Sequence, residues 1–329
     1  MSGSEGRVTL WMIEIFAAIA EDLSISTAAR RIGTSPSTVS QQLSKLEAIV
    51  NVPLVDRAAR PLRLTPQGEI FRRRALSILD EAALARAELA DRGLASLARF
   101  RLGMIEDFDA DVTPRLLGEM GDVLRDCQFL LETGPSHRLL SQLEDRALDM
   151  VVAADTAAAA DWMEVHPLLE EPFVAAVPLR DGRPAAETLA ELARRPLIQY
   201  TQRHHMGRQI AAHLTRQNLV LAHRYEMDSY HAILAMVAEG AGWTILTPLG
   251  LLRAQRFLGR VAVVSLPGAP LSRQIALWSR RGALGTMPAD IARRLRGILG
   301  DLIVAPARAR MPWLEATLRI LPEAPVYVP

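Results

Sequence analysis

The chain has little of what several protein classes require. It contains a single cysteine, Cys127, so an intrachain disulfide is excluded, and a reducing compartment such as the cytoplasm is expected. The formal net charge of +1 excludes a surface coated in basic charge, so any contact with nucleic acid must be local. No apolar run reaches the length of a membrane span, and residues 1–7 lack the apolar core of a secretion signal. Neither a membrane protein nor a secreted protein is therefore expected.

The sequence also lacks the short motifs of common enzymes. A Gly-x-Ser-x-Gly nucleophile elbow, a phosphate-binding glycine loop and a His-Glu-x-x-His motif do not occur. His204, His205 and His213 have no cysteine partner and no helical pair at a spacing of four, which argues against a metal site. We therefore expect no enzyme activity, no metal and no cofactor. Cys127 has no second thiol to resolve an oxidised form, which favours a structural role over redox sensing.

Two short helices joined by a tight turn are predicted within Ser26–Glu47. The first is expected over Thr27–Ile32, and a Gly-Thr pair ends it. Ser35 then supplies an N-cap oxygen, and Pro36 occupies the first helical position, where its missing N–H has no consequence. The second helix is expected to run to about Val50, because apolar residues recur at spacings of four, three and four.

The other face of this second helix is small, polar, and uncharged or basic. A helix of this kind fits the major groove of DNA, where Gln41 can pair with an adenine edge. An ordinary amphipathic helical hairpin is the alternative explanation. The residues expected to contact DNA from this region are Ser35, Ser37, Thr38, Ser40, Gln41, Ser44 and Lys45.

A small wing is predicted to follow the second helix. Two short strands are expected over Pro53–Arg57 and Leu62–Gly68, around a turn at Ala58–Pro61. Arginines on a hairpin beside a recognition helix suit contacts with phosphates or with the minor groove. The wing residues expected to make such contacts are Arg57, Arg60 and Arg63.

An ordered series of short segments runs through about the first 70 residues. The segments are Ala28-Ala29, Ser35, Ser40-Gln41-Gln42-Leu43, Leu46-Glu47, Leu54-Val55-Asp56-Arg57 and Leu64-Thr65-Pro66-Gln67-Gly68. Together they resemble the winged helix-turn-helix of LysR-type transcriptional regulators. The resemblance implies binding to a double-stranded DNA operator, and it is more specific than a helix-turn-helix pattern alone.

One long helix is predicted over residues 68–97, which contain no proline and are mostly Ala, Leu, Arg and Glu. A long exposed helix with one apolar side needs a partner, and the same helix of a second subunit is expected to provide it. Such pairing would place two recognition helices over the half-sites of a roughly palindromic operator. The alternative is that the helix packs only on its own chain.

Beyond Ser96, predicted strands alternate with predicted helices, which indicates parallel sheets covered on both faces. Two α/β lobes are expected: lobe I over about 98–168 and 270–304, and lobe II over about 169–269. The strand Arg273–Trp278 and the helix Pro288–Leu299 would return to lobe I, so a cleft forms between the lobes at the carboxyl ends of the strands. This half resembles, more weakly, the effector-binding domain of the same regulators, whose lobes are similar to periplasmic solute-binding proteins. The segments that carry this resemblance are Leu102-Gly103, Leu148-Asp149 and Val237–Gly242.

Three loops are expected to line this cleft: Ile105–Asp109, Tyr200–His205 and Asp228-Ser229. Relatives often have small hydroxyl residues in the first loop, whereas this chain has three acids there, which would repel an anion unless a base neutralises them. One hypothesis is a ligand with a cationic or multiply hydroxylated portion, held by Glu106 or Asp107 and packed on Phe108. The alternative is that these acids cap the following helix or point into solvent. The expected effector-binding residues are Glu106, Asp107, Phe108, Tyr200, Thr201, Arg203, His204, Asp228 and Ser229.

The resemblance implies an α+β multidomain transcriptional regulator of the cytoplasm. Residues 1–67 would bind DNA, residues 68–97 would form the linker helix, and residues 98–304 would bind a small-molecule effector of unknown identity. A homodimer or homotetramer would hold the operator, and the effector would shift the population of its arrangements. The alternative function is a solute-binding or scaffold protein of the same fold with weak or repurposed DNA binding. Residues 305–329 form an extension, with a helix predicted at Trp313–Ile320 and a strand or docking segment at Val326–Val328.

Overall fold

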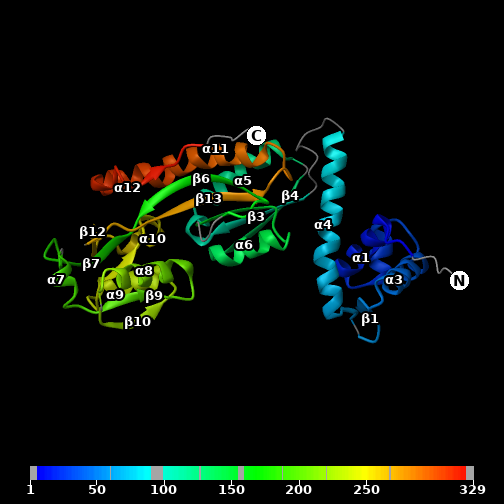
Figure 1. The fold of residues 1–329 in the computed structure, drawn as a ribbon, viewed down its shortest axis with the longest axis horizontal. Coiled ribbons are helices and arrows are strands. Elements are labelled where there is room, and N and C mark those ends of the chain that lie inside the picture. The colour runs from blue at the N-terminus through cyan, green and yellow to red at the C-terminus, as the bar shows by residue number, and fades with distance from the viewer. Residues whose placement is uncertain are drawn as a thin grey trace. The chain divides into compact units, whose positions relative to one another are not determined.

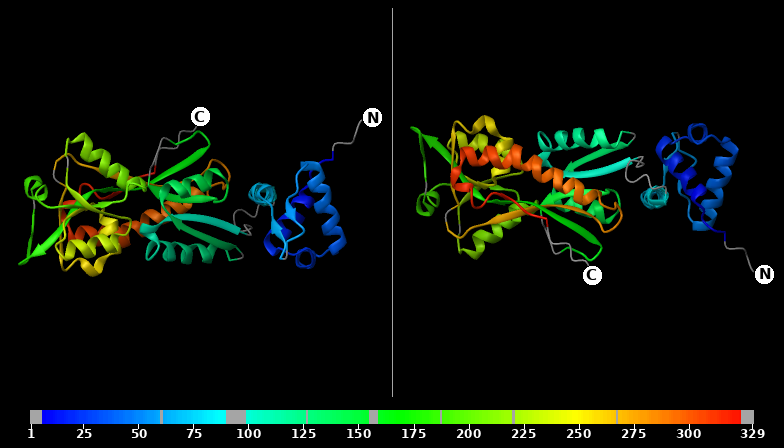
Figure 2. Two further views of the ribbon diagram at one scale, coloured as in Figure 1. Left: turned by 90° about the horizontal axis from the view of Figure 1, so that it is seen from below. Right: turned by 90° about the horizontal axis from the view of Figure 1, so that it is seen from above.

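The computed structural model describes residues 6–59, 61–89, 99–125, 127–154, 159–186, 188–219, 221–266 and 268–323. The chain divides into two compact units, one of residues 1–97 with 144–147 and the other of residues 98–143 and 148–329. The first unit contains α1 to α4, and the second contains both lobes (Figures 1 and 2). In the described part of the chain, no helix is long and apolar enough to cross a membrane.

The first unit is a helix-turn-helix followed by a wing and a long helix. Phe16 and Ile19 of α1 and Leu43 and Leu46 of α3 are fully buried together and form the centre of its core. Phe71 of α4 packs edge-on against Phe16, with ring centroids 5.1 Å apart. The elements of this unit are α1 Leu10–Asp22, α2 Ile25–Arg31, α3 Pro36–Val50, β1 Val55–Asp56, β2 Arg63–Leu64 and α4 Pro66–Leu89.

The predicted start of the second helix is confirmed in detail. The Ser35 hydroxyl accepts a hydrogen bond from the N–H of Thr38 at 3.1 Å, and Pro36 opens α3. The wing is shorter than expected, because Pro66 begins α4 and the predicted strand over Leu62–Gly68 is reduced to two residues. The Thr65 hydroxyl accepts from the N–H of Gly68 at 2.9 Å, which stabilises this early helix start. The part of the predicted long helix beyond residue 89 lies outside the described residues.

Lobe I is built on a six-stranded mixed sheet with the order β14-β6-β13-β5-β3-β4. Its first three strands in the chain, β3 to β5, run parallel as predicted. The expectation of a parallel sheet was wrong for β13, however, because β13 pairs antiparallel with both β5 and β6. The elements are β3 Arg99–Ile105, α5 Val112–Val123, β4 Gln128–Gly134, α6 Ser136–Glu144, β5 Met150–Ala154, β6 Met163–Pro172, β13 Ser272–Arg280, α11 Met287–Leu299 and β14 Arg319–Ile320.

The two crossings between the lobes form one antiparallel ribbon, in which β6 leaves lobe I and β13 returns to it. Ser272 pairs with Pro172 at one end of this ribbon, and Arg280 pairs with Met163 at the other. β6 ends at Pro172, and a separate strand, β7, follows over Val174–Arg180. Much of β6 is only half-buried, so acidic, apolar and proline residues are mixed along it. This mixture lacks the alternating pattern by which a strand is predicted from sequence.

Lobe II contains two small sheets. In one, β7 lies between β11 and β12 and pairs antiparallel with both; in the other, β9 and β10 are parallel. A single parallel bridge between Leu197 and Trp243 links them. The elements are β7 Val174–Arg180, β8 Arg183–Pro184, α7 Leu189–Leu192, β9 Leu197–Tyr200, α8 His205–Arg216, β10 His223–Met227, α9 Tyr230–Ala238, β11 Thr244–Leu246, α10 Pro248–Arg253 and β12 Val261–Ser265.

The C-terminal extension is packed against the lobes. A π-helical turn over Gly300–Val304 joins α11 to α12 (Ala305–Arg310), and the orange and red helices run along this unit past both lobes (Figure 2). The predicted helix over Trp313–Ile320 was wrong: a 3₁₀ turn ends at Leu314, and β14 then pairs with β6. Leu314 and Leu318 are fully buried, so tertiary packing fixes this segment. The predicted strand at 326–328 lies outside the described residues.

Candidate DNA-binding surface and effector cleft

The polar face of α3 is presented to solvent as a continuous surface. Val39, Leu43 and Leu46 are fully buried, and this burial forces the opposite side of the helix outward. The side chains of Gln41 and Lys45 have no partner in the described part of the chain, so they are available to a ligand. The predicted residues on this surface are Ser35, Ser37, Gln41, Ser44 and Lys45, which are exposed, and Thr38 and Ser40, which are half-buried.

Three hydroxyl groups are already linked at the start of this surface. The Ser35 hydroxyl lies 2.8 Å from those of both Ser37 and Thr38. This cluster keeps small, hydrogen-bonding groups at the N-terminus of α3, where the helix dipole favours a phosphate. The same end of the helix can therefore contact the DNA backbone while Gln41 lies one turn further along.

The wing is tied to α3 through a glutamate whose role the sequence did not reveal. Glu47 accepts hydrogen bonds from the N–H groups of Leu54 and Val55 at 2.8 and 3.2 Å, and from Arg57 at 2.9 Å. Arg57 also donates to Ser44 at 2.9 Å, so its charge is partly engaged within the protein. Arg63 is exposed on β2, whereas Arg60 lies outside the described residues.

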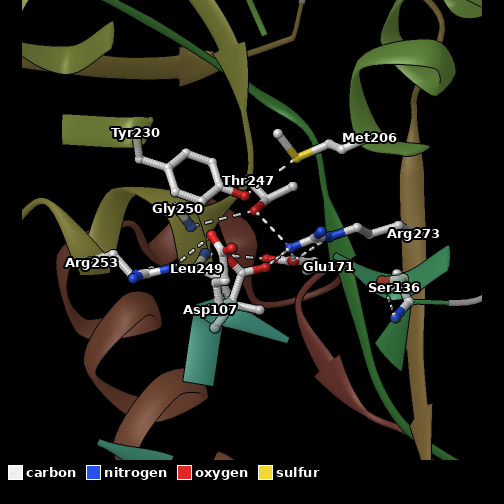
Figure 3. A network of polar contacts seen from close by, with 12 residues as sticks. Asp107, Ser136, Glu171, Met206, Tyr230, Thr247, Leu249, Gly250, Arg253 and Arg273 are labelled. Carbon is white, nitrogen blue, oxygen red and sulfur yellow. Dashed lines mark hydrogen bonds and ion pairs between the residues drawn. The ribbon is translucent and has the colours of Figure 1, made fainter. Parts of the chain in front are cut away.

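The second candidate site is a cavity of about 50 Å³ in the cleft between the lobes. Arg273 of β13 lies at its base and joins Asp107, which follows β3, to Glu171 of β6 (Figure 3). The guanidinium Nη2 lies 2.7 Å from Asp107 and 2.6 Å from Glu171, and Nε lies 2.7 Å from Glu171. Nη2 also donates to the hydroxyl of Thr247 at 3.3 Å. The side chains of Asp107 and Arg273 are 7% exposed, and that of Glu171 is fully buried.

Burial sets the electrostatics of this cluster. It raises the pKa of Glu171, and Arg273 opposes this effect. Burial alone would lower the pKa of Arg273, but Glu171 and Asp107 raise it well above its ordinary value, so the guanidinium stays charged. Glu171 also accepts the N–H of Leu249 at 3.2 Å, so both of its carboxylate oxygens are engaged. A guanidinium that holds residues of both lobes therefore forms the floor of the cleft.

Aromatic side chains form another part of the cavity wall. The hydroxyl of Tyr200 lies 3.3 Å from Nδ1 of His204, and the Tyr200 and Tyr230 rings lie 5.3 Å apart. Tyr230 donates to the sulfur of Met206 at 3.5 Å. Burial raises the pKa of both tyrosines, and the charge of Asp107 adds to each shift. Both hydroxyls are therefore protonated at neutral pH and can donate or accept hydrogen bonds.

The structure brings only some of the predicted effector residues together. Glu106, Asp107, Tyr200 and His204 line the cavity. Packing of a ligand on Phe108 is contradicted, because its side chain is fully buried in the lobe core. Asp107 does not cap the next helix or point into solvent, since its carboxylate is paired with Arg273.

The remaining predicted residues do not line the cavity. Thr201 is 1% exposed, and its hydroxyl donates to Glu226 at 2.6 Å. Ser229 accepts from the N–H of Ala232 and caps α9. Arg203 and Asp228 lie outside the cavity lining.

Sequence reasoning missed the residues that organise the site: Ser136, Glu171, Tyr230, Thr247 and Arg273. Arg273 lies 166 positions from Asp107 and 102 positions from Glu171. No local pattern connects positions this far apart. The sequence offered one clue, because the acids of the first loop would repel an anion unless a base neutralised them. Arg273 is that base for Asp107.

Two family models match this chain. One, described as the LysR substrate binding domain, matches residues 96–295, and the other, described as a bacterial regulatory helix-turn-helix protein of the lysR family, matches residues 10–69. The chain belongs to the LysR family. This LysR-family chain is therefore a DNA-binding transcriptional regulator with an effector-binding domain, as its motifs predicted. Members of the family are regulators rather than enzymes.

Individual relatives agree with this assignment. The regulator DgdR of Burkholderia cepacia is 35% identical over 158 residues, which are 46% of this chain and 53% of that protein. A probable hydrogen peroxide-inducible genes activator of Mycobacterium avium is 28% identical over 309 residues, 92% of this chain and 97% of that protein.

Solved structures of similar fold span most of the chain. A full-length OxyR variant from Pseudomonas aeruginosa has a TM-score of 0.66 and 23% identity, covering 88% of this chain and 95% of that one. CbnR in complex with its target DNA has a TM-score of 0.57 and 19% identity, covering 88% of this chain and 100% of that one. At this level of identity, the similarity establishes the fold of the LysR-family regulator and not its ligand.

Proposed function

We propose that this LysR-family regulator binds a roughly palindromic operator as a homodimer or homotetramer, and that a small molecule in the cleft controls this binding. The observation that carries the proposal is the exposed polar face of α3, where Gln41 and Lys45 have no partner in the described part of the chain. A protein that had abandoned DNA binding would have no need for such a surface beside a tethered wing. Since the target is chromosomal DNA, the site of action is the cytoplasm.

Exposed apolar side chains support the oligomer. On α4, Ile70 is 55% exposed and Ile78 is 42% exposed, and a spacing of eight residues separates their directions by only about 80°, so both lie on one side of the helix. On lobe I, Val123 is 56% exposed, Leu130 is 51% exposed and Leu131 is 37% exposed, and β4 is an edge strand. Apolar groups gathered on a helix face and on a sheet edge are typical of surfaces that a second subunit covers.

The cleft supports control by a ligand. Asp107 belongs to lobe I and Thr247 to lobe II, and Arg273 contacts both. A ligand that binds beside Arg273 contacts groups whose separation depends on how far the lobes are closed, so it favours one degree of closure over another. The difference between the ligand's binding free energies for those two states limits the change in operator affinity. We propose this regulatory role, and no catalytic one, for the cleft.

Some relatives are named as hydrogen peroxide-inducible activators, but we do not extend peroxide sensing to this chain. Cys127 is its single cysteine, so a disulfide within the chain is impossible. Burial raises the pKa of Cys127, and the charge of Asp149 raises it further. A thiol that stays protonated reacts slowly with peroxide.

Sequencing of genomic fragments captured by the purified protein tests the proposal. We expect an inverted repeat to be enriched, with an affinity that falls steeply as salt rises. Gln41→Ala should lose this enrichment, whereas Gln255→Ala, an exposed glutamine of the effector-binding unit, should retain it. Absence of any enriched sequence, both with and without cell extract as a source of effector, would favour the alternative of a solute-binding or scaffold protein.

A further inference from the structure

One wall of the cleft cavity carries more negative than positive charge. Glu106 and Asp107 line the cavity, Glu171 lies directly beneath, and Arg273 is the cation that contacts the last two. Arg253 approaches Glu106 only to 4.0 Å, which is too far for a hydrogen bond. The Glu106 side chain is 51% exposed, so its carboxylate can accept hydrogen bonds from a ligand. Arg253 pairs more closely with Asp109, at 3.1 Å, so four carboxylates meet two guanidinium groups here. This excess of negative charge favours a cationic group at this wall.

Another wall of the cavity consists of the first turns of two helices. The lining residues there are Gly134, Pro135 and Ser136 at the start of α6, and His204, His205 and Met206 at the start of α8. None of these residues is acidic, and the N-cap residue of α8 makes no side-chain hydrogen bond to the helix. The first N–H groups of a helix have no partner within it, and the helix dipole adds partial positive charge. This wall therefore favours an anionic group.

Arg273 adds one strong donor to the cavity. Its side chain is 7% exposed, and its Nε and Nη2 atoms are engaged by Glu171, Asp107 and Thr247. Its Nη1 atom has no partner in the described part of the chain, although Arg273 lines the cavity. A carboxylate is the group that best matches a guanidinium nitrogen left unused in a buried site.

The small volume of the cavity favours a compact ligand. A volume of about 50 Å³ corresponds to roughly three to five water positions, at about 10–15 Å³ for each water. Glycine and alanine, with about five or six non-hydrogen atoms, approach this size. In an α-amino acid, the ammonium and carboxylate groups are attached to the same carbon, so one small molecule can reach both walls.

We propose that the cleft binds a small zwitterion, an α-amino acid of about the size of glycine or alanine. Its ammonium lies on Glu106 and Asp107, and its carboxylate lies on Nη1 of Arg273 and the first turns of α6 and α8. The protonated hydroxyl of Tyr200 lies beside both charges and hydrogen-bonds to either. This inference rests on the proposed role of the cleft as the effector site, and it adds the chemical class of the effector.

Calorimetric titration of the full-length protein tests this assignment with three probes of matched size: L-alanine, ethylamine and propionate. We expect alanine to bind at least tenfold more tightly than either compound with a single charge. Glu106→Gln should weaken alanine binding about tenfold, which is the lower end for a charge-assisted hydrogen bond because Glu106 is half-exposed. Glu239→Gln is the matched control, since this exposed acid lies at the opposite end of α9 from Tyr230, and it should leave the affinity unchanged.

The outcomes separate this inference from the proposed function. If ethylamine or propionate binds as tightly as alanine, one of the two walls is not used, and the zwitterion assignment is overturned. It is also overturned if none of the three binds while the protein captures its operator, an outcome that leaves the proposed function intact. If alanine binds as expected but does not change operator affinity at saturation, the ligand class stands, and control of DNA binding through the cleft fails.

Discussion

Replacement of Arg273 by methionine should destabilise the effector-binding unit strongly. The variant keeps most of the side-chain volume but removes the cation that contacts two carboxylates, one fully buried and the other 7% exposed. Breaking a buried ion pair by removing one partner typically lowers the free energy of unfolding by about 3–5 kcal/mol. We expect a loss in this range near pH 8, measured by urea unfolding with tryptophan fluorescence. Trp243 and Trp278 report on this unit, since they are 1% and 3% exposed.

The loss should depend on pH in a defined direction. Burial already raises the pKa of Glu171 and Arg273 lowers it, so removal of Arg273 raises it further. Between the ordinary glutamate pKa of about 4.3 and this raised value, the folded variant binds more protons than the unfolded chain. Its free energy of unfolding therefore falls as pH rises through that window. We expect a smaller loss near pH 5 than near pH 8.

Two further variants test whether unpaired carboxylates cause the loss of stability in Arg273→Met. Adding Glu171→Gln to Arg273→Met removes the fully buried charge and should recover about half of the loss at pH 8. Arg293→Met removes an arginine whose side chain is 65% exposed, and it should change the free energy of unfolding by less than about 0.5 kcal/mol. If Arg273→Met is within about 1 kcal/mol of the unmodified protein at pH 8, or if its loss is the same at both pH values, unpaired carboxylates are not the cause.

Three other predictions concern the DNA-binding and oligomer surfaces. Gln41→Ala should relax base preference, whereas Arg63→Ala should weaken binding to all sequences about equally. Competition binding with operator and random duplexes distinguishes the two effects, and unchanged discrimination in Gln41→Ala would contradict the assignment of the α3 face. Ile78→Asp on the exposed side of α4 should reduce dimer formation in light scattering without lowering helix content, and an unchanged mass would mean that this helix does not pair. Leu130→Asp on the edge strand β4 should likewise reduce the size of the assembly, and loss of the fold instead would show that Leu130 supports its own lobe.

Much of the fold could be predicted because its signals are local. The Ser35-Pro36 start of α3 was predicted correctly, since the cap acts within one turn of helix. The parallel β3–β4–β5 arrangement also follows from the alternation of predicted strands with predicted helices. The segment 313–320 was predicted wrongly because β14 forms only where β6 offers a free edge, and a sequence pattern cannot show that edge.

The candidate sites divide in the same way. The sequence by itself determined the α3 face, because the buried residues Val39, Leu43 and Leu46 recur with the helical period and leave the polar residues outside. The sequence also assigned Glu106, Asp107, Tyr200 and His204 to the cleft, and they line it. Only the tertiary structure decided the ion cluster at its floor. Asp107, Glu171 and Arg273 come from three segments that meet when β13 returns along β6, and burial then fixes their charges. Helix caps and periodicity act over a few residues, whereas an ion cluster acts through space, and so only folding reveals it.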